Sequence, residues 1–256
     1  VDAVTFTGST EVGRYFLGYS AESNLKRVVL ELGGKSPQII MPDVRGLLAQ
    51  VAADQANAIF FAAGQNCTAG SRIIVANELR SEFVDLLAAQ AETYVVGNSL
   101  DPQTTLGPLI EPDAVDRVER YVDTARAGGA AVVTGGQRVL TDTGGYFYAP
   151  TVVTNVSPDD AIVREEIFGP VVAVLGFDTE AEAIRMANDT TYGLAANIWS
   201  KDIDTAIRAA RSVRAGTVSI NGYSEGDITT PFGGYRQSGF GGKDNGLEAF
   251  EQYTEQ

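Results

Sequence analysis

The chain contains no histidine and only one cysteine, Cys67, among its 256 residues. A single cysteine excludes an internal disulfide framework, and without histidine we predict no zinc site and no other bound metal. A catalytic cysteine-histidine pair of the protease kind is excluded for the same reason. Basic residues are also scarce, since 19 Lys and Arg stand against 33 Asp and Glu, which gives a formal net charge of −14. This acidic balance argues against nucleic acid and anionic membranes as partners.

Long hydrophobic runs are missing as well, because no apolar stretch approaches the roughly 18 residues needed to span a bilayer. The composition, 44% hydrophobic and 20% charged, is that of a globular protein with one large core or two smaller ones. A single thiol suits a reducing, cytoplasmic location. The sequence opens directly in a strand pattern, without an initiator methionine or a targeting segment. We therefore expect it to be part of a longer protein.

Strand and helix patterns alternate along the chain, which indicates an α/β protein. Helices are predicted where apolar residues recur at helical spacing, at residues 9–19, 44–62, 81–94, 115–127, 179–188, 203–212 and 244–250. Strands are predicted at residues 3–7, 26–32, 37–41, 72–75, 130–134, 151–154, 171–177, 194–199 and 216–220. The glycine-rich segment 222–242 is expected to be a long functional or packing loop.

Cys67 follows an apolar helix pattern and stands in a short loop bracketed by glycines. Most lone cysteines are buried and act as small hydrophobes, so a structural role is one interpretation. The neighbours of Cys67 favour the other interpretation, an exposed nucleophile, because they are polar or glycine and let a ligand approach the backbone closely. These neighbours are Gly64, Gln65, Asn66, Thr68 and Gly70.

Glu31 is the strongest candidate for the group that handles a proton beside such a thiol. It ends an apolar run and is followed by Gly33 and Gly34. A strand-end carboxylate can simply face water. However, a glutamate inside an apolar strand, with no Lys or Arg adjacent to it, is a candidate for a raised pKa and a role as a general base.

These segments carry a resemblance to a known family. The chain resembles the C-terminal half of an aldehyde dehydrogenase of the NAD(P)-dependent superfamily, and it is similar to the branch that acts on aminoaldehydes derived from polyamines. Six motifs match in order and in spacing, at residues 6–13, 30–37, 64–67, 165–171, 188–195 and 231–239. The resemblance implies an α/β fold in which an aldehyde dehydrogenase-like catalytic domain accompanies the last part of a Rossmann-like cofactor domain.

The same resemblance implies how the chain is divided. Residues 1–33 would be the remnant of the dinucleotide-binding domain, and residues 34–237 the catalytic domain that carries the thiol. Residues 238–256 would return to the cofactor domain and begin an oligomerisation segment. The full-length protein is then expected to form a homo-oligomer, a dimer or a tetramer, whereas residues 1–256 alone are expected to be unable to turn over NAD.

A glycine-rich turn between the first strand and the first helix is a candidate phosphate site, because the start of a helix offers unpaired backbone amides. A capped turn without any ligand explains the same residues equally well. The turn lacks the Lys and Ser or Thr of a nucleotide-triphosphate loop, since Arg14 and Tyr15 stand there. The resemblance assigns Gly8 and Ser9 to the dinucleotide pyrophosphate and Val12 to the adenine side.

Further cofactor contacts are implied by the resemblance at Leu32, Gly33, Glu166 and Phe168. Glu166 would bind the hydroxyls of the nicotinamide ribose, which is a sound use of a carboxylate, and Phe168 would pack against that end of the cofactor. Without the resemblance, Glu165 and Glu166 could both be solvated, and Phe168 could belong to the core. The expected cofactor is NAD, and the choice between NAD and NADP stays open.

The resemblance places a group of substrate-contacting residues around the thiol and in the loop before the last motif. These are Asn66, Thr68, Glu225, Asp227 and Phe232. The acidic pair would lie near the mouth of a substrate tunnel, where it could recognise a cationic aldehyde. An exposed acidic loop in an acidic protein is the simpler interpretation of the same two residues.

The implied reaction is the oxidation of an aldehyde to a carboxylic acid through a cysteine thiohemiacetal and a thioester. Cys67 would attack the aldehyde, the Cys67 amide would hold the oxyanion, and Glu31 would activate the hydrolytic water. Many members have a carboxylate where this chain has Lys243, so a proton relay through that position is in doubt. Alternatives are a member that reduces acyl phosphates or acylates coenzyme A, and a truncated, non-catalytic scaffold.

Overall fold

A mainly parallel sheet lies at the centre of the protein. The structure is a computed structural model and describes residues 1–223 and 227–254. The strand order of this sheet is β11-β10-β3-β4-β9-β8-β5, and only the pairing of β8 with β5 is antiparallel. In chain order its strands are β3 (Pro37–Ile40), β4 (Arg72–Ala76), β5 (Ala131–Thr134), β8 (Thr151–Thr154), β9 (Val171–Phe177), β10 (Ala195–Trp199) and β11 (Thr217–Ile220).

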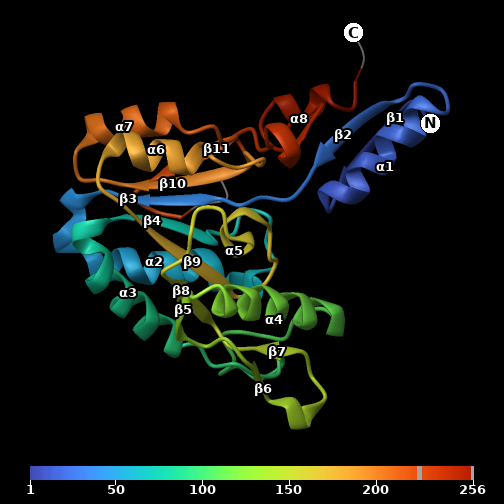
Figure 1. The fold of residues 1–256 in the computed structure, drawn as a ribbon. Helices are drawn as coiled ribbons and strands as arrows, with labels where there is room; N and C mark the ends of the chain where they lie inside the picture. The colour runs from blue at the N-terminus through green and yellow to red at the C-terminus, as the bar shows by residue number, and fades with distance from the viewer. Residues whose placement is uncertain (224–226, 255–256) are drawn as a thin grey trace.

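Helices cover both faces of this sheet (Figure 1). The pair α2 (Leu48–Phe60) and α3 (Asn77–Glu92) lies on one face, and α6 (Glu180–Asn188) and α7 (Ile203–Ser212) lie on the other. The central strands β3, β4, β9 and β10 are therefore buried along almost their whole length and mostly apolar, rather than alternating between buried and exposed residues, as expected of parallel strands that are covered on both sides. The main hydrophobic core lies along these strands.

The remaining helices are short or peripheral. They are α1 (Thr10–Ala21), α4 (Pro112–Ala127), α5 (Ala161–Arg164), α8 (Glu248–Glu251) and the 3-10 turns Pro42–Leu47, Phe61–Gly64, Thr141–Thr143 and Arg236–Ser238. Side-chain caps start several helices, because a hydroxyl or carboxylate oxygen satisfies an otherwise unpaired amide. The Ser9 hydroxyl accepts from the Val12 amide in this way, and Thr179 does the same for α6.

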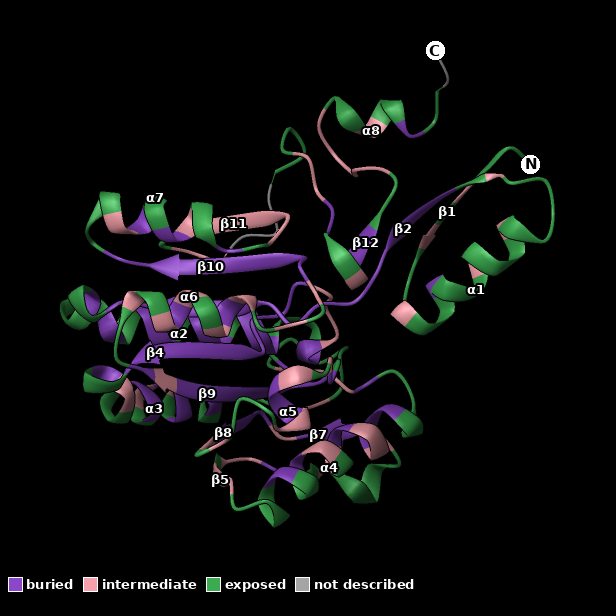
Figure 2. Ribbon diagram, turned by 45° about the horizontal axis from the view of Figure 1, so that its top comes forward, coloured by how far each residue is buried: buried purple, intermediate pink, exposed green. Residues whose placement is uncertain are grey.

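A second, smaller sheet stands beside the main one, where β1 (Ala3–Thr7), β2 (Arg27–Glu31) and β12 (Gly239–Phe240) pair in the order β1-β2-β12. Its own apolar cluster joins Val28, Leu30 and Leu32 to the side chains of β1 and α1. Figure 2 shows β2 buried, while α1 and β1 are largely exposed. The chain runs directly from β2 into β3, so the link at residues 32–36 connects the two sheets.

The predicted α/β class is confirmed, and most predicted elements are present. The helix predicted over 44–62 is wrong as one element, because the structure divides it into a 3-10 turn, α2 and a second 3-10 turn with positive φ angles. The short hairpin of β6 (Arg138–Val139) and β7 (Phe147–Tyr148), together with α5 and β12, was not predicted. In the described part of the chain, no helix is long and apolar enough to cross a membrane.

Candidate active site

Cys67 lies in a tight loop between α2 and β4. Ala62 and Ala63 open this loop with positive φ angles of 49° and 56°, which residues other than glycine rarely adopt. Gly64 follows with a φ of 71°, and a Cβ atom there would lie 2.1 Å from the carbonyl oxygen of Gly169. Neighbouring backbone therefore holds this loop in an unusual conformation, which fixes where the thiol stands.

Side chains from a distant segment brace the Cys67 loop. The Asn66 side-chain oxygen accepts from the amide of Thr68 at 3.2 Å and from its hydroxyl at 3.1 Å. The Asn66 amide group donates to the Tyr223 hydroxyl at 3.1 Å, and that hydroxyl also lies 2.9 Å from the Thr68 hydroxyl. The Tyr223 amide in turn donates to Asp54 on α2 at 3.0 Å. Tyr223 thus ties both neighbours of Cys67 together, and the sequence analysis missed it.

Two consecutive glycines bring the link between β2 and β3 against the thiol loop. A Cβ atom on Gly34 would lie 2.4 Å from the carbonyl oxygen of Cys67, and one on Gly33 would lie 2.1 Å from a carboxylate oxygen of Glu166. The Gly34 amide donates to the other oxygen of Glu166 at 3.1 Å. Side chains at both positions would push these partners apart, so the link can approach Cys67 and Glu166 this closely only because residues 33 and 34 are glycines.

Glu31 is buried at the end of β2, with 6% of its surface exposed. Burial raises its pKa to about 7, the Asp244 carboxylate adds to that increase, and the Lys243 ammonium group opposes it. One carboxylate oxygen, Oε2, is buried and has no hydrogen-bond partner among the described residues. A carboxylate with a pKa near 7 and an unused oxygen is suited to accept a proton at neutral pH.

A cavity of about 700 Å³ brings the two candidate catalytic residues together with most candidate cofactor residues. It is lined by Thr7, Gly8, Ser9, Glu11, Glu31, Leu32, Gly33, Gln65, Asn66, Cys67, Arg117, Glu166 and Phe168. Val12 is absent from this lining, and its side chain is 40% exposed on α1. Residues from both sheets therefore face one space, with Cys67 on one side and the start of α1 on the other.

A second cavity of about 460 Å³ reaches the thiol loop as well. It is lined by Asn66, Cys67, Thr68, Asp227, Ile228, Phe232 and Asn245. Four of the five candidate substrate residues line it, whereas Glu225 lies outside the described residues. Hydrogen bonds from Thr229 lower the pKa of Asp227, which keeps it ionised at neutral pH. Asn66 and Cys67 are common to both cavities, so the thiol can meet a ligand from either one.

The segment that presents Glu166 is held in a strained turn. Phe168 has a φ of 56°, although it carries a bulky side chain, and it is partly exposed on the cavity wall. Arg117 of α4 donates to the Ile167 carbonyl oxygen at 3.1 Å and supports this turn from below. The neighbouring Glu165 points elsewhere and accepts from the Tyr121 hydroxyl, which separates the two adjacent carboxylates. The sequence pattern held no signal for Arg117.

Burial also raises the pKa of Glu166, and the Gly34 amide and the Lys35 ammonium group oppose that increase. Lys35 has only 1% of its surface exposed, and its ammonium nitrogen has no hydrogen-bond partner among the described residues. Burial and the nearby charge of Arg72 lower its pKa to about 7, against the influence of Glu166 and Glu165. A buried amine that is partly protonated at neutral pH thus acts on the carboxylate that faces the cavity.

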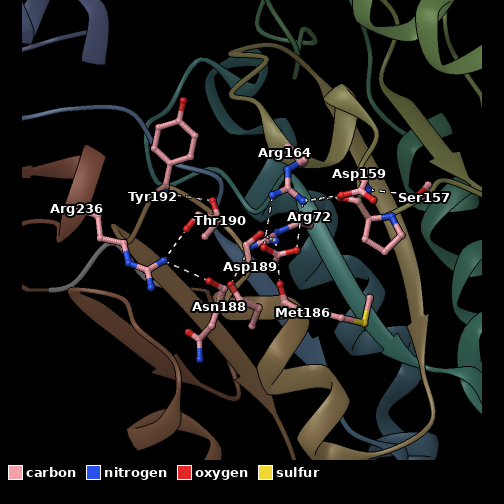
Figure 3. A network of polar contacts seen from close by, with 12 residues as sticks. Arg72, Ser157, Asp159, Arg164, Met186, Asn188, Asp189, Thr190, Tyr192 and Arg236 are labelled. Carbon is pink, nitrogen blue, oxygen red and sulfur yellow. Dashed lines mark hydrogen bonds and ion pairs between the residues drawn. The ribbon is translucent and has the colours of Figure 1, made fainter.

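A separate polar network lies between α6 and the central strands, as Figure 3 shows. Arg72 of β4 donates to the carbonyl oxygens of Met186 at 3.1 Å and Ala187 at 2.9 Å, and Arg164 pairs with Asp189 at 3.2 Å. A cavity of about 800 Å³ borders this network, but neither Cys67 nor Glu31 lines it. We therefore assign the network to the support of the last turn of α6, and the reactive groups to the 700 Å³ cavity.

The chemistry available to the 700 Å³ cavity follows from its side chains. A thiol, a buried carboxylate poised near neutral pH and a second buried carboxylate share one space that a helix start also faces. Among the described residues, no group of three or more Cys, Asp or Glu side chains is placed to hold a metal ion. The arrangement suits covalent catalysis by the thiol with carboxylate-assisted hydrolysis.

Comparison with known proteins shows which sequences are similar to this chain. The sequence model of a family described as the aldehyde dehydrogenase family matches residues 1–256. An aminoacetaldehyde dehydrogenase of Pseudomonas aeruginosa is 48% identical over 255 residues, which are 100% of this chain and 50% of that protein. The chain spans about half the length of the curated relatives it matches. The resemblance stated from the six motifs is confirmed.

Solved structures show the same likeness. A crystal structure of indole-3-acetaldehyde dehydrogenase complexed with NAD+ matches with a TM-score of 0.97 and 45% identity, over 100% of this chain and 51% of that one. A gamma-glutamyl-gamma-aminobutyraldehyde dehydrogenase of Burkholderia cenocepacia matches with a TM-score of 0.96 and 50% identity, again over 100% and 51%. The predicted fold is thereby confirmed beyond its class.

Proposed function

Because the chain belongs to the aldehyde dehydrogenase family, we propose that the protein that carries it oxidises an aldehyde to a carboxylic acid with NAD+. The observation that carries this proposal is the single cavity lined by both Cys67 and Glu31, the only thiol of the chain and a buried carboxylate with a pKa of about 7. A thiol that forms an acyl-enzyme and a base that hydrolyses it are the two groups this reaction needs.

In the first step, the Cys67 thiolate attacks the aldehyde carbon and forms a thiohemiacetal. The developing oxyanion needs a donor, and we assign this role to the backbone amide of Cys67, in the loop that Tyr223 and Gly64 hold in place. The 460 Å³ cavity delivers the aldehyde to the thiol, and the 700 Å³ cavity receives the cofactor on its other side. Entry from two sides allows both reactants to be bound at once.

The 700 Å³ cavity fits the nicotinamide end of a dinucleotide. Glu166 presents a partly buried carboxylate for the ribose hydroxyls, and the Gly33-Gly34 link leaves no side chain in the way. Ser9 caps the start of α1, where the helix terminus favours a phosphate, and Gly8 lines the same space while its amide donates to the Glu31 carbonyl oxygen at 3.0 Å. Bound NAD supplies the hydride acceptor that converts the thiohemiacetal into a thioester. Leu32 and Phe168 line the same space and would exclude water from it.

Glu31 then takes a proton from a water molecule, whose oxygen attacks the thioester carbon. The carbon–sulfur bond breaks, the acid is released and the Cys67 thiolate is restored. This role favours hydrolysis over transfer of the acyl group to phosphate or coenzyme A, because a base poised to activate water wastes a thioester intended for transfer. Assembly into a homo-oligomer and a cytoplasmic location remain proposals that accompany this function.

For the substrate, we propose an aldehyde that carries a positive charge, such as an aminoaldehyde. Asp227, ionised at neutral pH, and Phe232 line the 460 Å³ cavity that leads to Cys67. The carboxylate can attract an ammonium group, and an aromatic ring face stabilises one. Of the three relatives compared above, two are named for aminoacetaldehyde and for gamma-glutamyl-gamma-aminobutyraldehyde, which supports this choice, and the third is named for indole-3-acetaldehyde.

The test uses the full-length protein with NAD+ and two aldehydes of equal length, one with a terminal ammonium group and one without. We expect formation of reduced cofactor with both, and none with Cys67→Ser. Asp227→Asn should raise KM for the charged aldehyde by about two- to fivefold, the usual worth of an exposed charge pair, and leave KM for the neutral aldehyde unchanged. Turnover that survives in Cys67→Ser would refute the function, and equal KM changes for both aldehydes would refute the substrate class.

A further inference from the structure

Gly233 marks a point where two charged side chains meet the same stretch of backbone. A Cβ atom on Gly233 would lie 2.6 Å from Oε1 of Glu31 and 3.1 Å from the ammonium nitrogen of Lys243. The two charged groups therefore stand on the same side of Gly233, no farther apart than these two distances together. They are not in direct ion-pair contact, and neither has an ion pair with another described side chain.

The ammonium group of Lys243 is fixed where it stands. It donates to the carbonyl oxygen of Gly233 at 2.8 Å and to that of Gly234 at 3.3 Å, and it lies 5.0 Å from the centre of the Tyr235 ring. Two carbonyl dipoles and an aromatic face are the surroundings that hold a cation in one position. Lys243 thus binds the backbone beside Glu31 rather than extending into solvent.

Asp244 places the opposite charge in the same region. Its backbone exchanges hydrogen bonds with Phe232 in both directions, at 2.5 Å and 2.8 Å, and its carboxylate accepts from Gln252 at 3.0 Å. These hydrogen bonds join segment 231–234 to segment 242–245, which carries the charges of Lys243 and Asp244. Asp244 raises the pKa of Glu31 and Lys243 lowers it.

The charged groups around Glu31 come from several elements. Lys243 and Asp244 are the charged neighbours that affect Glu31 directly. The other titratable groups that share a cavity wall with Glu31 are Glu11, Cys67, Arg117 and Glu166. Of these, the Glu166 carboxylate accepts a hydrogen bond from the Gly34 amide, and Arg117 donates one to the backbone carbonyl oxygen of Ile167. The two consecutive residues 243 and 244 therefore form a pair of opposing charges directed at one carboxylate.

We propose that Lys243 is a positioning residue, whose ammonium group anchors the Gly233-Gly234 backbone beside Glu31 and, opposed by Asp244, sets the pH range in which Glu31 accepts a proton. The proposal rests on the base role of Glu31 given above. It gives Lys243 no part in relaying the proton that Glu31 takes from water, since an ammonium group has no acceptor for that proton. Its effect on Glu31 is electrostatic and depends on its charge, while the anchoring depends on its hydrogen bonds.

The experiment measures the ionisation of Glu31 directly in the full-length protein. The carboxyl band that is lost in Glu31→Gln identifies Glu31 by difference infrared spectroscopy, and its intensity against pH gives the midpoint without any turnover. Lys243→Met should move this midpoint upward by about one pH unit, because an opposite charge within about 6 Å typically lowers a carboxyl pKa by one unit or more. Asp244→Asn should move it downward, since the amide keeps the contact with Gln252 but not the charge.

Two variants serve as controls. Lys243→Arg keeps the charge and should hold the midpoint, whereas Lys201→Met makes the same substitution as Lys243→Met on an exposed turn after β10 and should change nothing. The pH dependence of thioester hydrolysis should follow the infrared midpoints, so that hydrolysis at pH 6 slows in Lys243→Met and accelerates in Asp244→Asn.

The decisive result is a shift of the Glu31 midpoint in opposite directions in Lys243→Met and Asp244→Asn. A midpoint that is unchanged in Lys243→Met would overturn the proposal. So would midpoints that move in the same direction in Lys243→Met and Asp244→Asn, because general disruption of the site would affect both variants alike. If the wild-type protein forms no thioester, the proposed function fails instead. The infrared midpoints still decide in that case whether Lys243 and Asp244 act on Glu31.

Discussion

Replacing Gly34 by alanine tests how closely the two sheets approach each other at the thiol. The added Cβ atom would lie 2.4 Å from the carbonyl oxygen of Cys67, whereas ordinary contact begins at 3.4 Å. The backbone on one side must therefore move by about 1 Å, and a displacement of that size at a reacting group can cost about 100-fold in rate. The strain itself should destabilise the fold by about 1 to 3 kcal/mol, as other overpacking substitutions do.

The assay is kcat/KM for aldehyde oxidation in the full-length protein, together with the midpoint of urea unfolding. Gly46→Ala is the matched control, because Gly46 is exposed in a 3-10 turn and an added Cβ atom there meets nothing within 4 Å. We expect Gly34→Ala to lose about two orders of magnitude in kcat/KM and Gly46→Ala to lose none. If Gly34→Ala matches the wild type in both rate and stability, the close approach of Gly34 to the thiol loop is wrong.

Two further predictions concern buried charge. Because the pKa of Glu31 is raised from 4.5 to about 7 in the folded protein, Glu31 leaves the stability unchanged below pH 4.5 and lowers it progressively as the pH rises toward 7. Glu31→Gln should therefore increase the free energy of unfolding by about 1 to 3 kcal/mol at pH 8 and leave it unchanged at pH 4.5; an equal change at both values would contradict the burial of Glu31. Arg72→Met should destabilise by about 2 to 4 kcal/mol, since the carbonyl oxygens of Met186 and Ala187 lose their buried donor. Urea unfolding measures this, and a loss below about 1 kcal/mol would show that water replaces the guanidinium group.

The elements that the sequence predicted best are the strands in which nearly every residue is buried. Strands β4 and β9 are buried on both faces because helices cover them, and their runs of Ile and Val are visible without the structure. The helix predicted over 44–62 failed at its ends, because the turn at Ala62 and Ala63 depends on contacts with the backbone near Gly169 and not on local propensity. The two-residue strands β6 and β7 are too short to show any period.

The candidate site was predictable where its residues lie within motifs. Cys67 and Glu31 could be selected from their own surroundings in the sequence, and both line one cavity. The contacts that position them come from far along the chain, as with Tyr223, which lies more than 150 positions from Asn66. The charges that act on Glu31 leave no local pattern, because Lys243 and Asp244 reach it only after β12 pairs with β2. Only the family resemblance pointed to Lys243. Long-range pairing of this kind leaves no local pattern.

The most direct test of the account is the intact mass of Glu31→Gln after mixing the full-length protein with NAD+ and an aldehyde. The variant keeps the size and hydrogen-bonding capacity of Glu31 but not its basicity, so hydrolysis should slow by roughly two to four orders of magnitude while acylation continues. We expect one equivalent of reduced cofactor and a mass increase equal to the acyl group, located on the peptide that contains Cys67. A variant that turns over at the wild-type rate, or that accumulates no acyl group on Cys67, would contradict the assignment of Cys67 as nucleophile and Glu31 as base.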